Sequence, residues 1–582
     1  MFVCTIILSY MEKINGKIFS VIGYWLIVIG LLSVLVYSRF VNLGWGLPYP
    51  MHPDERNMAN AVHQLNCKFP ISNFQFPNKF QFSINNFQNC FNPHFFAYGQ
   101  LPLYLGYIIT FLLNVDATIG LRIISAIASV ISFIVIIKII KIITKKESPF
   151  LTLISSLLII FSPYAIQFAH FGTTESLLMI FYLIIIYYSL LFVDRKISTL
   201  SFVINISMFV GLSMATKVSS LLFLIPPFTV LLFNTISLKT KKSIISSKNS
   251  VIFYLYVLMS KIIDVFILGF LSFVVFCIFA PHNLLNFNDF ISSINYESDV
   301  ALGRSLVFYT RQFFDTIPIL FQFEEVFSYV FGWPVFILGA LGFAGLSWKD
   351  KMINFLRFAF LIYFIPSAII YAKWSRFMAP IFPLITIFAI LFILNIKIIK
   401  FIKIIIIIIA IVPGIAYLSI YQNPDIRFQA SEWIYKNIPN ESYVLSETAN
   451  VVDIPIESES YKVHKVYQVI SFNFYDIDES PILQQELADH LAKADYIFVP
   501  SRRIFANHPK QAYPILNQYY DDLFSGKLGF EKVAEFESFP KIKFQVASYK
   551  FQVNFPDEQA EETWTVFDHP VIRIYKKVKS VL

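Results

Sequence analysis

Long apolar runs dominate this chain and restrict it to one structural class. Hydrophobic residues make up 56% of the composition and charged residues only 14%. The apolar residues gather in runs of about 17–25, the length of helix that crosses a bilayer core. The sequence therefore predicts a polytopic α-helical membrane protein.

Basic clusters beside these runs set the predicted topology. The positive-inside rule places the clusters near residues 13–17, 138–146, 195–196, 239–248, 349–351 and 397–403 in the cytoplasm. This explains the formal net charge of +8 without a nucleic-acid partner. About eleven spans then follow, near residues 19–40, 120–143, 149–168, 175–193, 200–216, 219–236, 261–280, 327–346, 353–372, 377–396 and 402–420.

Three segments differ from the pattern of one apolar run for each span. The run 200–236 is too long for one crossing, so we expect two spans joined by a turn at Lys217. The shorter apolar run 101–113 predicts a helix that lies at the surface or re-enters the bilayer. Residues 1–17 lack the pattern of a cleavable signal, and the run 19–40 is interpreted as a retained anchor.

An odd number of spans places the C-terminal region on the outer side of the plasma (inner) membrane. That side also receives the first outer loop (41–119), the long outer loop (281–326) and the turns at 168–175, 217 and 373–376. We therefore predict a transmembrane domain over residues 1–421 and an extracytoplasmic domain over 422–582. Helix-like segments 428–437 and 481–494 and strand-like segments 443–446 and 496–499 predict that the second domain is soluble and α/β.

The segment Met51–Arg56 places two carboxylates directly after the first span. A charge is costly near hydrocarbon, so charged residues at the end of a span suggest a functional site. The alternative is a polar loop in which Asp54 caps a helix. Farther along the same loop, we predict a disulfide between Cys67 and Cys90 outside the cell, the alternative being two free thiols.

Several motifs on the outer side resemble one family. His52-Pro53-Asp54-Glu55 resembles the Asp-Glu signature of membrane glycosyltransferases of the GT-C fold, particularly family 39 and the aminoarabinose-transferase-like group that includes protein O-mannosyltransferases. Further similar segments follow in family order: Asn92–Leu103 with His94 and Tyr98, Arg122, Phe168–Glu175, Ala215–Lys217, and Lys373–Pro380 with Arg376. In the second outer loop many members carry Thr-Pro-Asp, whereas this chain has Glu175 and no proline.

The resemblance implies an inverting transfer of a sugar from a polyprenyl-phosphate donor to an acceptor, either a protein or a glycan or lipid. Such a transfer needs one base, because a phosphate leaves without an acid. Asp54 is the predicted base, and Glu55 is predicted to orient the acceptor or a neighbouring cation. Cations stabilise the charge that develops on the phosphate. The candidates are Lys217 and Arg376, with Arg122, Arg304 and Arg311 in reserve, although each could instead snorkel to the interface.

Other functions remain open at this stage. Aromatic and charged residues in the long outer loop suit either sugar stacking or an interfacial belt. We expect no metal cofactor, the alternative being a divalent cation held by histidines with Asp54 and Glu55. A transporter or flippase for a lipid-linked saccharide is the main competitor, but transporters bind substrate near the bilayer midplane. A non-catalytic surface receptor would need fewer spans.

Overall fold

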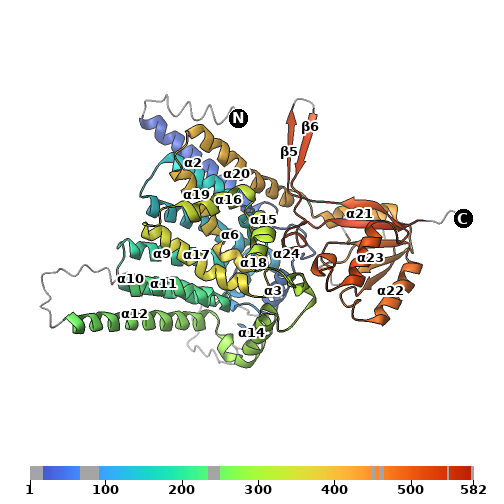
Figure 1. Ribbon diagram of the computed structural model, residues 1–582, viewed down its shortest axis with the longest axis horizontal. Helices are drawn as coiled ribbons and strands as arrows, with labels where there is room; N and C mark the ends of the chain where they lie inside the picture. Colours follow the sequence, from blue (N-terminus) through green and yellow to red (C-terminus); the bar gives the residue numbers. More distant parts are fainter. Residues whose placement is uncertain are drawn as a thin grey trace, which may run out of the picture.

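The computed structural model describes residues 17–65, 91–233, 250–448, 452–457, 465–546 and 549–578. A body of packed helices is followed by a sheet domain at one end of it (Figure 1). The predicted fold class, a polytopic helical domain with a C-terminal α/β domain, is confirmed.

The predicted spans all coincide with helices, although not all of these helices are long and straight. Within the described residues, six helices are long and apolar enough to cross a membrane, or eight spans if each bent helix pair counts as one. The six are α6 (Ala117–Thr144), α9 (Glu175–Val193), α12 (Ser250–Phe279), α17 (Lys351–Ile369), α18–α19 (Ser375–Met378, Phe382–Asn395, joined by η4, Ala379–Ile381) and α20 (Lys400–Tyr421). Eleven spans therefore stay a prediction.

Breaks in the remaining spans have local causes. Helices α7 (Pro149–Ile160) and α8 (Pro163–His170) meet at 53°, with Pro163 opening the second helix. Segment η3–α15 (Gln322–Phe327, Ser328–Val330) meets α16 (Trp333–Gly345) at 112°. The corner residue Gly332 has φ +71°, a backbone conformation that favours glycine.

Three shorter apolar helices account for the other predicted spans. They are the part Trp25–Phe40 of α2 (Lys17–Phe40), α10 (Thr199–Met214) and the pair η1–α11 (Val218–Leu224, Ile225–Phe233). Helix α10 ends and η1 begins on either side of Lys217, so the predicted turn is present.

Helix α5 (Gln100–Leu113) occupies the run predicted to lie at the surface. Leu101 and Leu103 are buried near its start, whereas Leu112 and Leu113 are exposed near its end. Its backbone packs closely on α6, where a Cβ on Gly120 would lie 2.4 Å from Thr110 Oγ1. The helix is thus only partly covered by protein, as expected for a helix at the surface.

The C-terminal domain contains a five-stranded sheet in the order β2-β1-β3-β7-β4. Strand β1 pairs in parallel with β2 and β3, and β7 pairs antiparallel with β3 and β4. The strands are β1 (Tyr443–Glu447), β2 (Gln468–Phe472), β3 (Tyr496–Val499), β4 (Phe530–Phe536) and β7 (Ile572–Lys577), and the helices are α21 (Ile426–Asn437), α22 (Pro481–Lys493), η5 (Phe505–Asn507) and α23 (Pro514–Phe524). All four segments predicted in this region have the expected structure.

Two segments of residues 422–582 leave this sheet domain. Strands β5 (Lys541–Val546) and β6 (Tyr549–Asn554) form a separate pair. The following segment carries α24 (Glu562–Thr565), and its Trp564, Val566 and Phe567 belong to the apolar core of the helical body. The predicted division at residue 421 therefore describes the chain order, but some residues after 421 pack in the core of the helical body.

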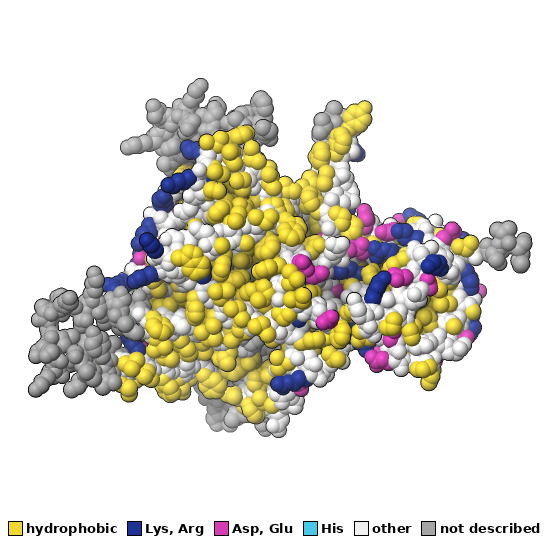
Figure 2. Space-filling view, viewed as in Figure 1, with side chains coloured by type: hydrophobic (Ala, Val, Ile, Leu, Met, Phe, Trp, Pro, Cys, Tyr) yellow, Lys and Arg dark blue, Asp and Glu magenta, His cyan; other side chains and the backbone are white. Residues whose placement is uncertain are grey.

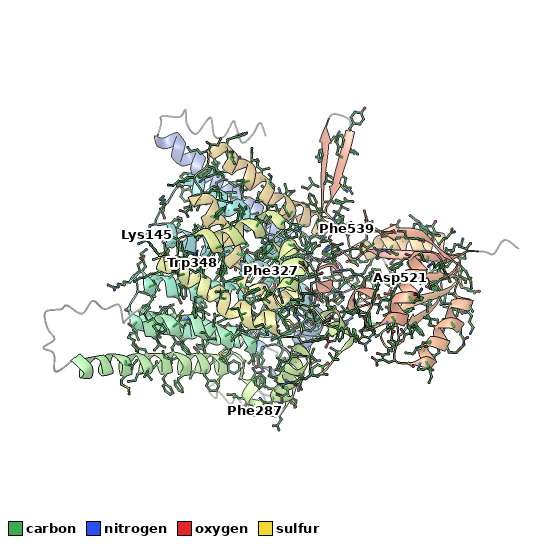
Figure 3. All side chains as sticks on the ribbon, in the orientation of Figure 1. Lys145, Phe287, Phe327, Trp348, Asp521 and Phe539 are labelled. Atoms are coloured by element: carbon green, nitrogen blue, oxygen red, sulfur yellow. The ribbon has the colours of Figure 1, made fainter. Side chains whose placement is uncertain are left out.

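The two ends of the helical body differ in charge. Lys145 and Trp348 lie at the end away from the sheet domain (Figure 3), and Lys and Arg side chains line that end in Figure 2. Helix α3 (Pro53–Gln64) and the sheet domain, which carries Asp521, lie at the opposite end. The structure thus puts Asp54 and the C-terminal domain on one side of the predicted bilayer.

This arrangement predicts which side of the membrane each end faces. With the native cysteines replaced, Ser525→Cys should react with a membrane-impermeant maleimide in intact cells or spheroplasts, because Ser525 is exposed on the sheet domain. Lys349→Cys, exposed at the opposite end, is the control and should react only after lysis. The reverse labelling pattern would invert the topology.

Candidate active site

Asp54 lies at the start of α3, near the end of the helical body that carries the sheet domain. The helix begins with His52 as its N-cap, whose Nδ1 accepts a hydrogen bond from the Asp54 amide at 3.2 Å. Asp54 is therefore a first-turn residue and not the cap, so the capping alternative considered from the sequence is wrong in this detail. Its carboxylate is favoured by the positive end of the helix dipole.

His52 can accept that hydrogen bond only while its ring is neutral. The ring is buried between Phe171 and Phe567, with centroid distances of 4.8 and 4.4 Å. Burial, with the nearby charges of Arg376 and Arg503, holds the pKa of His52 well below its ordinary value. The cap is therefore neutral at physiological pH, and it fixes the backbone that carries Asp54.

The neighbouring Glu55 is wholly buried and faces α6. Its two carboxylate oxygens accept hydrogen bonds from Nε and Nη2 of Arg122, both at 2.7 Å. The Gly172 amide also donates to Glu55 at 2.6 Å, and Arg122 donates to the carbonyls of Leu43 and Trp45 at 2.7 Å. Glu55 was predicted to orient either the acceptor or a neighbouring cation. Its contact with Arg122 matches the second role.

Arg376 reaches Asp54 from a distant part of the sequence. It lies in α18, and its Nη1 forms an ion pair with Asp54 Oδ2. The two side chains keep 18% and 20% of their surfaces exposed, so the pair can be reached from outside. The guanidinium lies 4.8 Å from the centre of the Trp374 ring, and its buried Nε has no hydrogen-bond partner among the described residues.

Lys217 packs against the residue that follows Arg376 in the chain. Its ammonium is 5.2 Å from the centre of the Tyr98 ring and 5.0 Å from that of Phe377, the residue after Arg376. Burial lowers the pKa of Lys217, and the carboxylates of Glu175 and Glu297 oppose that shift. The Lys217 ammonium thus lies near two other predicted site residues, Tyr98 and Glu175, and against the residue that follows Arg376.

A close backbone contact fixes the Lys217 turn against α5. The amides of Gly99 and Leu101 donate to the carbonyls of Thr216 and Ala215, at 2.9 and 3.1 Å. A Cβ on Gly99 would lie 2.0 Å from the Ala215 oxygen, so no other residue fits there. The glycine of the Tyr98-Gly99-Gln100 motif therefore places Tyr98 next to Lys217.

Residues of the C-terminal region lie against one side of this site, which the sequence did not predict. Glu561 accepts a hydrogen bond from the Ser375 amide at 3.1 Å, one residue before Arg376. Arg503 pairs with the buried Glu562 at 3.0 Å and lies 5.6 Å from the centre of the Phe567 ring. Arg502 and Arg503 follow strand β3. The carboxyl ends of parallel strands often carry functional residues, and this position was the one sequence feature that could have indicated the two arginines.

A buried charge network joins these C-terminal residues to the helical body. Asp568 accepts hydrogen bonds from the hydroxyls of Tyr417 and Tyr421, at 3.0 and 2.7 Å, and from Gln167 at 3.2 Å. His569 bridges Asp568 and Asp557, at 2.5 and 2.8 Å. Burial lowers the pKa of His569, but the two carboxylates raise it more, to about 10. His569 is therefore a cation that holds the segment in place.

Three other predicted site residues lie elsewhere. Arg304 is exposed and pairs with Asp299 at 3.5 Å. Arg311 donates to the Tyr475 carbonyl and pairs with Asp476 at 3.0 Å, which links the long outer loop to the sheet domain. His94 is exposed and has φ +49°. Each of these three residues thus has surroundings other than Asp54 and Arg376. Arg122, another reserve candidate for the donor phosphate, is paired with Glu55.

Two further predictions concern groups that the structure does not place. Cys67 and Cys90 lie outside the described residues, so the disulfide stays a prediction. Among the residues described, no group of three or more His, Cys, Asp or Glu side chains is arranged to hold a metal ion.

The family described as dolichyl-phosphate-mannose-protein mannosyltransferase matches residues 100–263. The matched segment contains Arg122, Glu175 and Lys217 and covers less than half of the chain. The resemblance to GT-C mannosyltransferases that the motifs predicted is therefore confirmed for this segment, within a polytopic membrane domain. No curated protein matches the sequence.

Two solved structures are among those to which the chain is similar. The oligosaccharyltransferase of Archaeoglobus fulgidus in its apo form has a TM-score of 0.44 and 12% identity, over 85% of this chain and 72% of that one. ArnT from Cupriavidus metallidurans in the apo state has a TM-score of 0.43 and 12% identity, over 71% of this chain and 65% of that one.

The Glu55–Arg122 pair gives a prediction about stability. Glu55→Gln leaves the Arg122 charge buried without a carboxylate, which costs about 3–5 kcal/mol. The apparent Tm of the purified protein in detergent should fall clearly, measured by the unfolding of its helices. Glu486→Gln on the exposed face of α22 is the matched control and should leave the Tm unchanged. Equal Tm values for both variants would contradict the role given to Glu55.

Proposed function

We propose that this chain is an inverting glycosyltransferase of the extracytoplasmic membrane face. It moves a sugar from a polyprenyl-phosphate donor to a protein, glycan or lipid acceptor. Two observations support this proposal: the reachable Asp54–Arg376 pair, and the ammonium of Lys217 on the ring of Phe377, the residue after Arg376. One carboxylate and two cations are what a phosphate-leaving transfer requires.

The reaction uses these residues in a single displacement. The acceptor oxygen attacks the anomeric carbon of the sugar while its proton passes to the Asp54 carboxylate. The bond between that carbon and the phosphate oxygen breaks, and polyprenyl phosphate leaves with one more negative charge. Arg376 and Lys217 stabilise that charge where it develops. Inversion follows because the acceptor enters on the side opposite to the phosphate.

The ion pair also orders the steps of the reaction. While Arg376 pairs with Asp54, its guanidinium occupies the carboxylate that takes the acceptor proton. A donor phosphate competes for the same guanidinium, whose Nε has no hydrogen-bond partner among the described residues. When Arg376 turns to the phosphate, the Asp54 carboxylate becomes accessible to the acceptor. Donor binding thus prepares the base for the acceptor.

The cluster does not suit a transporter. Its charges lie at the end of the helical body that carries the sheet domain, whereas transporter sites lie near the bilayer midplane. A transferase and a transporter therefore predict different products.

Mass spectrometry of cell-envelope glycans with and without the gene should show one missing sugar if the chain is a transferase. The missing sugar would also identify the donor and the acceptor.

The role of Asp54 is tested by a single-atom exchange. Asp54→Asn keeps the size of the side chain but removes the base, so the transfer rate should fall at least about a hundredfold. Asp521→Asn, on the exposed surface of α23, is the control and should transfer normally. Near-normal turnover of Asp54→Asn with an unchanged Tm would remove Asp54 from the mechanism.

The two cations give a separate prediction about the donor. Lys217→Ala or Arg376→Ala should weaken transition-state stabilisation by about 2–4 kcal/mol, the size of one lost preorganised contact. The measurement is kcat/KM for the lipid donor at saturating acceptor, with Lys436→Ala on the surface of α21 as control. If KM for the acceptor alone changes, the assignment to the donor phosphate is wrong.

A further inference from the structure

Strands β5 and β6 form a two-stranded antiparallel ribbon that stands apart from the five-stranded sheet. Figure 1 shows it projecting away from both domains, across the direction of helices α10 and α12. We call this pair of strands the ribbon.

The two faces of the ribbon are chemically opposite. Side chains alternate along a strand, and directly paired residues share a face. The register pairs Ile542 with Val553 and Phe544 with Phe551, whose rings stack at 5.4 Å. One face therefore carries Ile542, Phe544, Tyr549, Phe551 and Val553, and the other carries Lys541, Lys543, Gln545, Lys550, Gln552 and Asn554.

None of the other residues that the structure describes covers the apolar face. Tyr549 is 71% exposed, Phe544 and Phe551 are each 46% exposed, and Val553 is 45% exposed. Hydrophobic atoms are visible along the length of the ribbon in Figure 2. An isolated two-stranded sheet is marginally stable in water, and it needs a surface that covers its apolar face.

The base of the ribbon is fixed at the membrane domain. The Lys541 amide donates to Ser419 Oγ near the end of α20 at 3.1 Å, and buried Phe539 lies just before the first strand (Figure 3). Helix α20 exposes Ile408, Ile409 and Ile415 on its lipid-facing side. The ribbon thus begins where a lipid-exposed helix reaches the end of the bundle that carries the sheet domain.

We propose that the ribbon lies on the lipid surface of the bilayer beside α20. Its apolar face sits at the boundary between headgroups and acyl chains, and its three lysines remain at the level of the lipid phosphates. The ribbon does not cross the hydrocarbon, because both of its outer edges have unpaired backbone groups. This proposal does not depend on the transfer chemistry proposed above.

A second copy of the chain is a weaker candidate for the covering surface. Six residues extend for about 20 Å, and two strands span about 10 Å, so the face offers about 200 Å². A stable protein interface buries about 800 Å² on each partner. The ribbon face alone is too small for such an interface, whereas a bilayer surface sets no minimum area.

Neighbouring residues on opposite faces give a matched test. The full-length chain, with native cysteines replaced, carries Tyr549→Cys or Lys550→Cys labelled with an environment-sensitive fluorophore. Both positions are exposed, so neither label removes core packing. The protein is reconstituted in vesicles of phosphatidylcholine and phosphatidylglycerol. Nitroxide lipids quench the label either near the glycerol or at the end of the acyl chain.

The label at Tyr549 should be quenched at least about twofold more than the label at Lys550, and more by the shallow nitroxide than by the deep one. Equal quenching at both positions would overturn the proposal. Stronger quenching by the deep nitroxide would also overturn it, because the ribbon would then be inserted. Protection of Tyr549 from both lipid nitroxides and aqueous iodide would show that a protein surface covers the face instead.

Discussion

The buried pair of Glu55 and Arg122 is the interaction on which the site depends. It ties α3 to α6, and through Gly172 and the carbonyls of Leu43 and Trp45 it also fixes the loops around them. A buried charge is tolerated only when it is paired and fully hydrogen-bonded. Because Glu55 is the residue after Asp54, satisfying Glu55 also sets where the Asp54 carboxylate lies.

The C-terminal region is part of the site as well as a neighbouring domain. Phe567 packs against His52, Glu561 holds the backbone beside Arg376, and Asp568 and His569 anchor the segment to the helical body. The segment thus covers one side of the Asp54–Arg376 pair. Protein on that side of the pair keeps water away from it there, and this strengthens the electrostatic interactions that the proposed transfer uses.

The sequence predicted the candidate site unevenly. It pointed to Asp54 by its place after the first apolar run, and to Lys217 and Arg376 by their resemblance to the motifs of one family. It also listed Arg304 and Arg311, which have the same local character but pair with Asp299 and Asp476. The local sequence pattern indicates that a charged residue lies near the membrane surface. It does not indicate which carboxylate that residue will form an ion pair with.

The sequence by itself determined the membrane class, the apolar helices, the turn at Lys217 and two helices and two strands of the C-terminal domain. Those features depend on run length and periodicity, which are local. Only the tertiary structure decided that Asp54 meets Arg376, that Arg122 serves Glu55, and that residues 555–571 pack on the site. These contacts join residues far apart in the chain, and their partners are fixed by packing and by the need to neutralise buried charge.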